Sequence, residues 1–342
     1  MWLQSGLHYY KHGIAVAKAF FDAGHVLRDQ FPLPANSPGV MRIPTDHQAQ
    51  FREVASGLGV APVALSASQA ARCLGPFFRP TDDGSIYFRV PDTTFPEAEY
   101  VDLAREEARR GGALLRQTTD AAVLVPGKHG ADIQLSGINL DADYVLLAAG
   151  CSTGLLLNQL QIPHGLSVTR TPLLVVHNNS PLEASLLVDR ALNYSVTQPK
   201  PTRLVFGTRF EDNGCDPSNE SNRNTRPAEK DILYAKFTSA TGQRPPPSAY
   251  GFHVGYEIAP PADSHPPPQD LTPFIGQAPE FPNLLWTLPG RATMAWSHAQ
   301  TIVDRLDGQP VQPRSPVEVG ETWIHPVRMY FDESYDSARD RH

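Results

Sequence analysis

Cysteine is scarce in this sequence of 342 residues. Only Cys73, Cys151 and Cys215 are present, and they lie far apart without a C-x-x-C pair. A disulfide framework needs an even set of cysteines, and a zinc knuckle needs closely paired ones. We therefore expect neither, and we expect a reducing, cytoplasmic environment. His8 and His12 have the spacing of a metal site on a helix, but no glutamate or evident third ligand accompanies them, so we expect no metal centre.

Long apolar runs and an excess of positive charge are also absent. The apolar start "GIAVAKAFF" is interrupted by Lys18, and no run approaches the roughly 20 apolar residues of a membrane span. The net charge is -7, and the lysines and arginines are scattered along the chain, which argues against nucleic-acid binding. We therefore expect no nucleic-acid partner and no membrane span, and the remaining class of partner is a small-molecule substrate. The composition indicates no oligomeric state.

Apolar spacing predicts a mixture of helices and strands. Residues 12–31 place apolar side chains at three- and four-residue steps, as in a helix that ends before a proline. Residues 96–112 begin with a proline and acids and end with arginines and two glycines, which is the charge order that a helix favours. We predict short strands over residues 113–149, antiparallel strands over 171–212, and a strand followed by a helix over 283–306. The fold class is therefore α/β, in two closely joined domains.

One strand-turn-helix segment, "DYVLLAAGCSTGLLLNQL" at residues 143–160, has two interpretations. Its turn spells G-x-S-x-G, which would make Ser152 a hydrolase nucleophile, with an acid and a base chosen from residues such as Asp270 and His298. Alternatively, the small residues of Ala148–Gly150 make room for a cofactor against the end of the strand. The strand is apolar on both faces, so we expect it to be central in a parallel sheet.

A second strand-turn-helix corner of the same kind favours the cofactor interpretation. In "LWTLPGRATMAW" a strand leads through Gly290 to Thr293 at the start of a helix, whose free N–H groups suit an anion or a flavin carbonyl. Two such corners are what a buried dinucleotide requires.

Six segments along the chain carry a family resemblance. They are "SGLHYY", "FRVPDTTFPEAEYVDLAREEARRGGALL", "DADYVLLAAGCSTGLL", "RLVFGTRFED", "TPFIG" and "NLLWTLPGRATMAWSHAQTIVDRL". In this order they resemble the FAD-dependent oxidoreductases of the D-amino-acid oxidase and glycine oxidase superfamily, over nearly the whole chain to about residue 310. The resemblance implies a discontinuous, Rossmann-like FAD-binding domain at 1–35, 96–165 and 270–310, an antiparallel-sheet substrate domain at 36–95 and 166–269, and a peripheral tail at 311–342.

The family's first nucleotide-binding unit is missing from this sequence. Its G-x-G-x-x-G motif holds the FAD pyrophosphate, and the nearest spelling here, "GLGVAP" at Gly57, lacks the third glycine and leads into a proline. We therefore expect the FAD-binding domain to be incomplete at its N-terminus, through a misassigned start or a shortened form. The loss of that helix N-terminus would weaken FAD binding by several kcal/mol, roughly a thousandfold in affinity.

The resemblance also implies site residues. It implies hydride transfer from a substrate C–H bond to flavin N5, with His8, Arg291 and Tyr256 as the catalytic candidates and Arg291 as the charge that stabilises the reduced ring. The residues expected at FAD are Gly6, Leu7 and His8 beside the isoalloxazine, Ala121 at the adenine, Ala149 and Gly150 at the phosphate side, and Gly290, Arg291, Ala292, Thr293 and Met294 at the flavin O2 region.

The substrate expected from these residues is a small amine, amino acid or hydroxy acid. Such substrates are commonly held in the superfamily by an arginine on the strand before "P-x-I-G", where this sequence has Glu257 and Ile258. Two alternatives stay open at this point, a serine hydrolase that uses Ser152 and a non-catalytic remnant.

Overall fold

The computed structural model describes residues 2–31, 37–75, 78, 79, 81, 83–94, 97–115, 122–128, 130–135, 138–140, 142–177, 182–200, 202–208, 210, 215, 222, 224–261, 273–288 and 292–307. The strands are β1 (Trp2–Leu3), β2 (Gly39–Ile43), β3 (Val63–Leu65), β4 (Ile86–Val90), β5 (Thr93–Thr94), β6 (Val123–Gly127), β7 (Gly130–Leu135), β8 (Ile138–Leu140), β9 (Val145–Leu147), β10 (Ser167–His177), β11 (Leu186–Asp189), β12 (Tyr194–Lys200), β13 (Arg203–Thr208), β14 (Tyr250–Ala259), β15 (Phe274–Ala278) and β16 (Phe281–Leu288). The α-helices are α1 (Ile14–Gln30), α2 (Gln48–Gly57), α3 (Ala67–Leu74), α4 (Glu97–Arg110), α5 (Thr153–Gln159), α6 (Pro227–Thr241) and α7 (Ala295–Asp307), and the 3-10 helices are η1 (Leu7–His12), η2 (Thr45–His47), η4 (Gly150–Ser152), η6 (Pro247–Ala249) and η8 (Ala292–Met294). The predicted mixed α/β class is confirmed.

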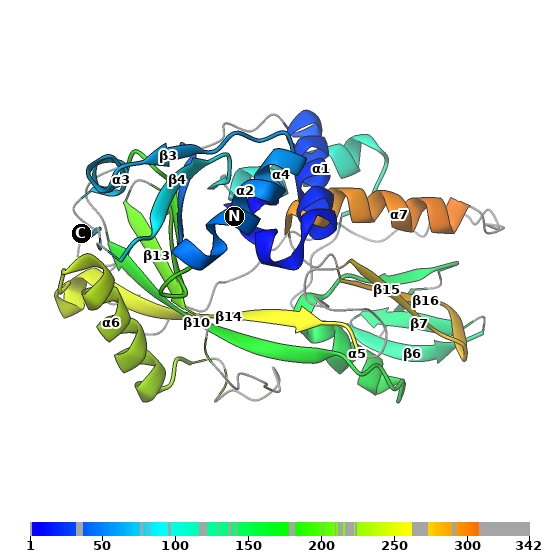
Figure 1. The fold of residues 1–342 in the computed structure, drawn as a ribbon. Coiled ribbons are helices and arrows are strands. Elements are labelled where there is room, and N and C mark those ends of the chain that lie inside the picture. Colours follow the sequence, from blue (N-terminus) through cyan, green and yellow to red (C-terminus); the bar gives the residue numbers. More distant parts are fainter. Residues whose placement is uncertain are drawn as a thin grey trace.

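An eight-stranded sheet forms the largest layer, in the order β14-β10-β13-β12-β11-β2-β4-β3. Its strands come from residues 39–90 and 167–259, and its longest pairing joins β10 to β14 (Figure 1). All neighbouring pairs are antiparallel except β11 and β2, which are parallel. The predicted antiparallel strands therefore sit in a mixed sheet.

The large sheet separates two hydrophobic cores. Because side chains alternate between the faces of a strand, Leu187 joins the core under α3 and α6, while Leu186 and Val188 join the core under η1, α1 and α2. Val40 and Met41 on the neighbouring strand β2 divide in the same way. The second of these cores supports the segment that the sequence predicts to face FAD.

Two three-stranded sheets, β15-β16-β9 and β6-β7-β8, pack against each other beside the large sheet (Figure 1). Asn283 on β16 joins them, because its side chain accepts from Ala131 N at 2.7 Å and donates to Ala131 O at 2.8 Å. Strand β9 pairs in parallel with β16, as the sequence predicts, with Leu147 opposite Trp286. Among the described residues, however, β9 is an edge strand and Leu146 is 40% exposed, so the prediction of a central strand covered on both faces was wrong for the structure described.

The helix predicted over residues 12–31 is confirmed as α1, which begins two residues later than predicted. Gly13, at φ +86°, ends η1 and begins α1, because a helical turn cannot continue through that backbone conformation. Helix α4 occupies the predicted position within 96–112. The short strands predicted from residue 113 onward begin later, because residues 113–115 form no strand and residues 116–121 lie outside the described part of the chain. No helix of the described segments is long and apolar enough to cross a membrane.

A buried arginine fixes the inner strands of the large sheet. The side chain of Arg42 on β2 is 2% exposed and pairs with Asp189 at 2.8 Å and with Asp83. The hydrogen bond from Arg42 lowers the pKa of Asp83 from 3.8 to about 2. The ion pairs therefore tie the loop before β4 to the centre of the sheet.

Acid should weaken this link in a defined window. The folded pKa of Asp83 lies below its unfolded value, so its contribution is present above about pH 4 and is lost as the pH falls from about 4 to 2. Because the Asp83 side chain is 46% exposed, we expect the contribution to be below about 1 kcal/mol. Urea unfolding at pH 5 and pH 3 checks this: the wild type should lose more stability than Asp83→Asn between the two, and equal losses would contradict it.

Candidate functional site

The segment Ser5–His12 is held from both sides. A buried carboxylate, Asp92, accepts hydrogen bonds from Ser5 N at 3.1 Å and from Ser5 Oγ. Burial raises the pKa of Asp92 above its usual value, opposed by the bonds from Ser5. On the other side, Gly6 at φ +85° touches α1 so closely that a Cβ there would lie 2.0 Å from Ala17 O. These contacts on two sides fix where η1 begins.

Three residues of η1, His8, Tyr9 and Tyr10, each contact a residue of another element. The guanidinium of Arg190, which follows β11, donates to the carbonyl of His8. The buried Tyr10 hydroxyl forms a 3.0 Å hydrogen bond with His47 Nδ1, and burial raises the pKa of Tyr10 to about 12. The ring of Tyr9 stacks on Phe20 of α1 at a centroid distance of 4.1 Å.

The second predicted corner lies against this segment. Thr293 in η8 accepts a hydrogen bond from Gln4 N at 3.2 Å, and Met294 shares a hydrophobic cluster with Tyr9. Helix α1 passes beside both, since a Cβ on Gly24 would lie 3.0 Å from Gln4 O and 3.6 Å from Thr293 Cγ2. The structure thus brings the predicted Gly6–His8 and Thr293–Met294 together, although 289 residues separate Gln4 from Thr293.

The first corner is open. The stretch Ala148–Gly150 at the carboxyl end of β9 is exposed, and a Cβ on Gly150, at φ +55°, would meet no atom within 4 Å. The buried Thr153 Oγ1 at the start of α5 has no hydrogen-bond partner among the described residues. Because β9 and β16 are parallel and adjacent, this corner and the one after β16 lie at the same edge of their sheet. Ligands of α/β proteins bind outside that edge.

Several predicted residues lie elsewhere or outside the description. Tyr256 on β14 lies on the large sheet, opposite the buried Arg170 of β10, and donates to Asn222 O at 2.9 Å. The predicted residues Ala121, Gly290 and Arg291 lie outside the described residues, and of Ala292 only the backbone is described.

The hydrolase interpretation gains no support from the described geometry. His298 is buried, and its Nε2 contacts Thr287 Oγ1 at 2.6 Å and Phe274 O at 3.2 Å. Burial lowers the pKa of His298 below its usual value. Ser152 is exposed at the open corner, and Asp270 lies outside the described residues. His298 is therefore engaged with β15 and β16 and is not paired with Ser152.

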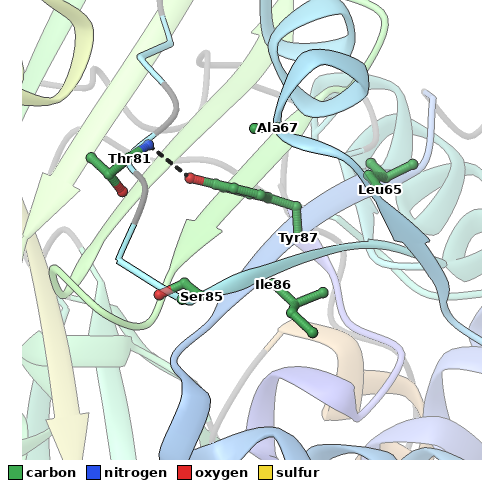
Figure 2. A pocket seen from close by; sticks show the side chains of 7 residues that line it. Leu65, Ala67, Thr81, Ser85, Ile86 and Tyr87 are labelled. Carbon is green, nitrogen blue, oxygen red and sulfur yellow. Dashed lines mark hydrogen bonds between the residues drawn. The ribbon is translucent and has the colours of Figure 1, made fainter.

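A surface hollow of 490 Å³ lies at the outer strands of the large sheet. Figure 2 shows its lining, where Thr81 N donates to the Tyr87 hydroxyl at 3.4 Å beside Leu65 and Ser85. Tyr87 belongs to the core on the sheet face opposite η1. This hollow is therefore separate from the two corners, and we place the candidate site at the corners.

The comparisons with known proteins agree with the geometry. The family model described as FAD dependent oxidoreductase, DAO, matches residues 2–305. The chain belongs to this family. No curated protein matches it significantly.

The fold of the family is also found among solved structures. Iminodiacetate oxidase from Chelativorans sp. BNC1 is 18% identical, with a TM-score of 0.59 over 90% of this chain and 80% of that chain. Glycine oxidase from Geobacillus kaustophilus is 12% identical, with a TM-score of 0.62 over 86% of this chain and 80% of that one. The FAD dependent oxidoreductase PA4991 from Pseudomonas aeruginosa is 14% identical, with a TM-score of 0.62 over 99% and 86%.

The cofactor of this family is FAD, and the described residues fit it. The exposed small residues of Ala148–Gly150 leave space that a side chain on Gly150 would fill. The neighbouring η8 leads into α7, and the first N–H groups of a helix suit an anion or a carbonyl oxygen. The strand-glycine-helix order of the sequence predicted both corners; the structure describes the strands and helices beside them, while Gly290 lies outside the described residues. The sequence gave no signal for Asp92 or Arg190, which bond Ser5 and His8 from 87 and 182 residues away.

Proposed function

We propose that this chain is an oxidoreductase that uses FAD to oxidise a small amine, amino acid or hydroxy acid. One observation carries the proposal: the parallel strands β9 and β16 end at the same edge of a sheet, each before a predicted glycine corner, inside a chain that matches the FAD-dependent family over residues 2–305. The solved relatives named after iminodiacetate and glycine support amine or amino-acid substrates. We further propose the division into an FAD-binding part at 1–35, 96–165 and 270–310 and a substrate part at 36–95 and 166–269.

When bound, FAD supplies the acceptor for the substrate's hydride at N5. The residues of the chain would position both reactants. Ser5 and Gly6 before η1, and Tyr10 within it, are each held by a partner, so His8 would be presented in one place. Arg291 would contribute positive charge at the second corner, and Tyr256, on β14 of the large sheet, would be a catalytic residue on the substrate side. Alignment of this kind matters more to hydride transfer than a strong base does.

A side chain at the open corner Ala148–Gly150 should weaken FAD binding without unfolding the chain. We expect Gly150→Asn to raise the Kd for FAD at least about tenfold, because its side chain occupies the free space, while asparagine tolerates a positive φ. The matched control is Gly59→Asn, at φ +68° with no atom within 4 Å and outside the site. Quenching of flavin fluorescence gives the affinity, and thermal unfolding of the FAD-free chains shows that both variants carry the same strain.

Two results would contradict the proposed function. One is a folded wild-type chain that shows no flavin absorption bands after incubation with FAD. The other is equal FAD affinity in Gly150→Asn and Gly59→Asn, which would place the cofactor away from this corner.

A further inference from the structure

Strand β14 has two faces with different surroundings. Phe252 belongs to the hydrophobic core under α3 and α6. Because side chains alternate along a strand, Tyr256 lies on that same face. Its hydroxyl donates to Asn222 O, the carbonyl that also accepts from Arg170 Nε. The opposite face of β14 carries His253, Gly255 and Glu257.

This opposite face is the one on which η1 packs. Val188 of β11 belongs to the core under η1, α1 and α2. Strand pairing leads from Val188 across β12, β13 and β10 to His253 of β14. Directly paired residues of antiparallel strands point to the same face of a sheet. His253 and Glu257 therefore lie on the η1 face of the large sheet.

The η1 face of β10 and β14 is polar and accessible. His253 and Glu257 are partly exposed, and so is Thr169, which lies opposite Glu257 on β10. An imidazole, a hydroxyl and a carboxylate thus come together on one side of two paired strands. A ligand can reach all three groups.

Gly255 leaves a gap between the two polar side chains of β14. Among the described residues, a Cβ at this position would meet only Thr171, at 3.7 Å from its O and 3.9 Å from its Cβ. His253 precedes this gap by two residues and Glu257 follows it by two, so both flank it on the same face. The strand therefore provides space for a small group beside a carboxylate.

The carboxyl end of β14 lies beside the first corner. Strand β14 contacts η4, which begins at Gly150. The adjoining segments also meet, because a Cβ on Gly165 would lie 3.1 Å from Pro261 and one on Gly154 would lie 2.9 Å from His164 Cε1. Figure 1 shows β14 running from α6 toward α5. The end of β14 that carries the gap is therefore next to the corner proposed for FAD.

We propose that Glu257 binds the ammonium group of an amine substrate in the gap at Gly255. An ammonium group donates strong charge-assisted hydrogen bonds to a carboxylate. The site therefore selects an amine over a hydroxy acid. This inference rests on the proposed function for the oxidation itself, and it transfers the substrate-side role from Tyr256, on the α6 face, to Glu257.

The test uses the full chain without added FAD, so that it is independent of cofactor binding. Saturation-transfer NMR compares butylamine with 1-butanol, its uncharged match, and with butyrate, which has the opposite charge. We expect butylamine to bind at least about tenfold more tightly than 1-butanol, because only the ammonium pairs with the carboxylate. Butyrate should bind more weakly than either. Equal affinity for butylamine and 1-butanol would overturn the site.

Substitution of the acid assigns the preference to Glu257. Glu257→Gln keeps the shape of the side chain and removes its charge, so it should abolish the preference for butylamine. Glu53→Gln, an exposed acid of α2, is the matched control and should retain it. A folded Glu257→Gln chain with the wild-type preference would overturn the assignment.

A shorter acid covers the case in which Glu257→Gln does not fold, which circular dichroism reports. Glu257→Asp keeps the charge but withdraws it by one methylene, so the preference for butylamine should fall severalfold without being lost. An unchanged preference in Glu257→Asp would also count against Glu257.

Gly255→Ala tests the position of the gap. Its Cβ makes ordinary contacts, so the chain should fold, and it should weaken the binding of butylamine and 1-butanol alike. The control is Gly111→Ala, whose Cβ would lie 3.4 Å from Ala108 O after α4, away from the large sheet. Butylamine binding in Gly255→Ala equal to that of the control would place the ligand elsewhere and overturn the site.

Failure of the proposed function has a different signature. A chain that prefers butylamine but shows no flavin absorption bands after incubation with FAD would contradict the proposed function and leave the ammonium site standing. A chain with flavin bands and no preference for butylamine would contradict the ammonium site alone.

Discussion

Gly6→Ala is expected to destabilise the chain by about 2–5 kcal/mol and to abolish FAD binding, through positive-φ strain and overpacking together. The new Cβ would lie 2.0 Å from Ala17 O and 2.9 Å from Ala17 C, and both are backbone atoms of α1 that no side-chain rotation can move. Either η1 or α1 must shift. Since the segment Ser5–Tyr10 also bonds to Asp92, Arg190 and His47, the shift would displace the segment that we propose to face the flavin.

Urea unfolding and flavin fluorescence quenching measure the two effects of this change. The control is Gly112→Ala, which has the same φ of +85° but no atom within 4 Å of its Cβ. It should cost only the conformational strain, about 1–2 kcal/mol. A Gly6→Ala chain as stable as Gly112→Ala and still able to bind FAD would show that the contact with α1 does not fix η1.

Glu229→Gln in α6 is expected to destabilise the chain by about 3–5 kcal/mol. The carboxylate forms a two-point ion pair with Arg170, at 2.6 Å to Nη1 and 3.1 Å to Nη2, and also accepts from Arg226 N at 2.8 Å. The two side chains are 1% and 9% exposed. Removal of the negative charge takes away the carboxylate that neutralises the buried guanidinium of Arg170, and an unpaired buried charge is costly.

A double substitution distinguishes the ion pair from loss of packing. Arg170→Met combined with Glu229→Leu removes both charges and should recover part of the stability lost in Glu229→Gln, measured by urea unfolding. The exposed pair of Lys18 and Asp22 serves as the control, because its side chains are 61% and 55% exposed and Asp22→Asn should change stability little. A loss below about 1 kcal/mol in Glu229→Gln would contradict the argument.

Local patterns were enough to place many elements. The charge order of residues 96–112 places α4, and the order of strand, glycine and helix at residues 143–160 and 283–306 places the two corners. These features depend on backbone preferences and side-chain periods within a dozen residues, which a sequence displays directly. The same reasoning failed at residues 113–115, predicted as a strand, and for the central position of β9, because strand pairing depends on which distant segments are available.

The contacts that hold the candidate site could not be inferred from local pattern. The sequence around Asp92 predicts a strand that leads into a turn, and only the pairing of β1 with β5 brings Asp92 to Ser5. The sequence places Arg190 only after a strand, and the packing of η1 on the large sheet then brings its guanidinium to the carbonyl of His8. Both are polar residues whose role depends on what lies next to them in space.

The sequence by itself determined the α/β class, the glycine corners and the resemblance to FAD-dependent oxidoreductases, because each is written in short runs of residue type and spacing. Only the tertiary structure decided that Gln4 meets Thr293, that Gly6 has no room beside Ala17, and that Arg190 donates to the carbonyl of His8. The physical reason is that burial, charge compensation and close contact are properties of neighbours in space, and folding alone brings residues hundreds of positions apart within hydrogen-bonding distance.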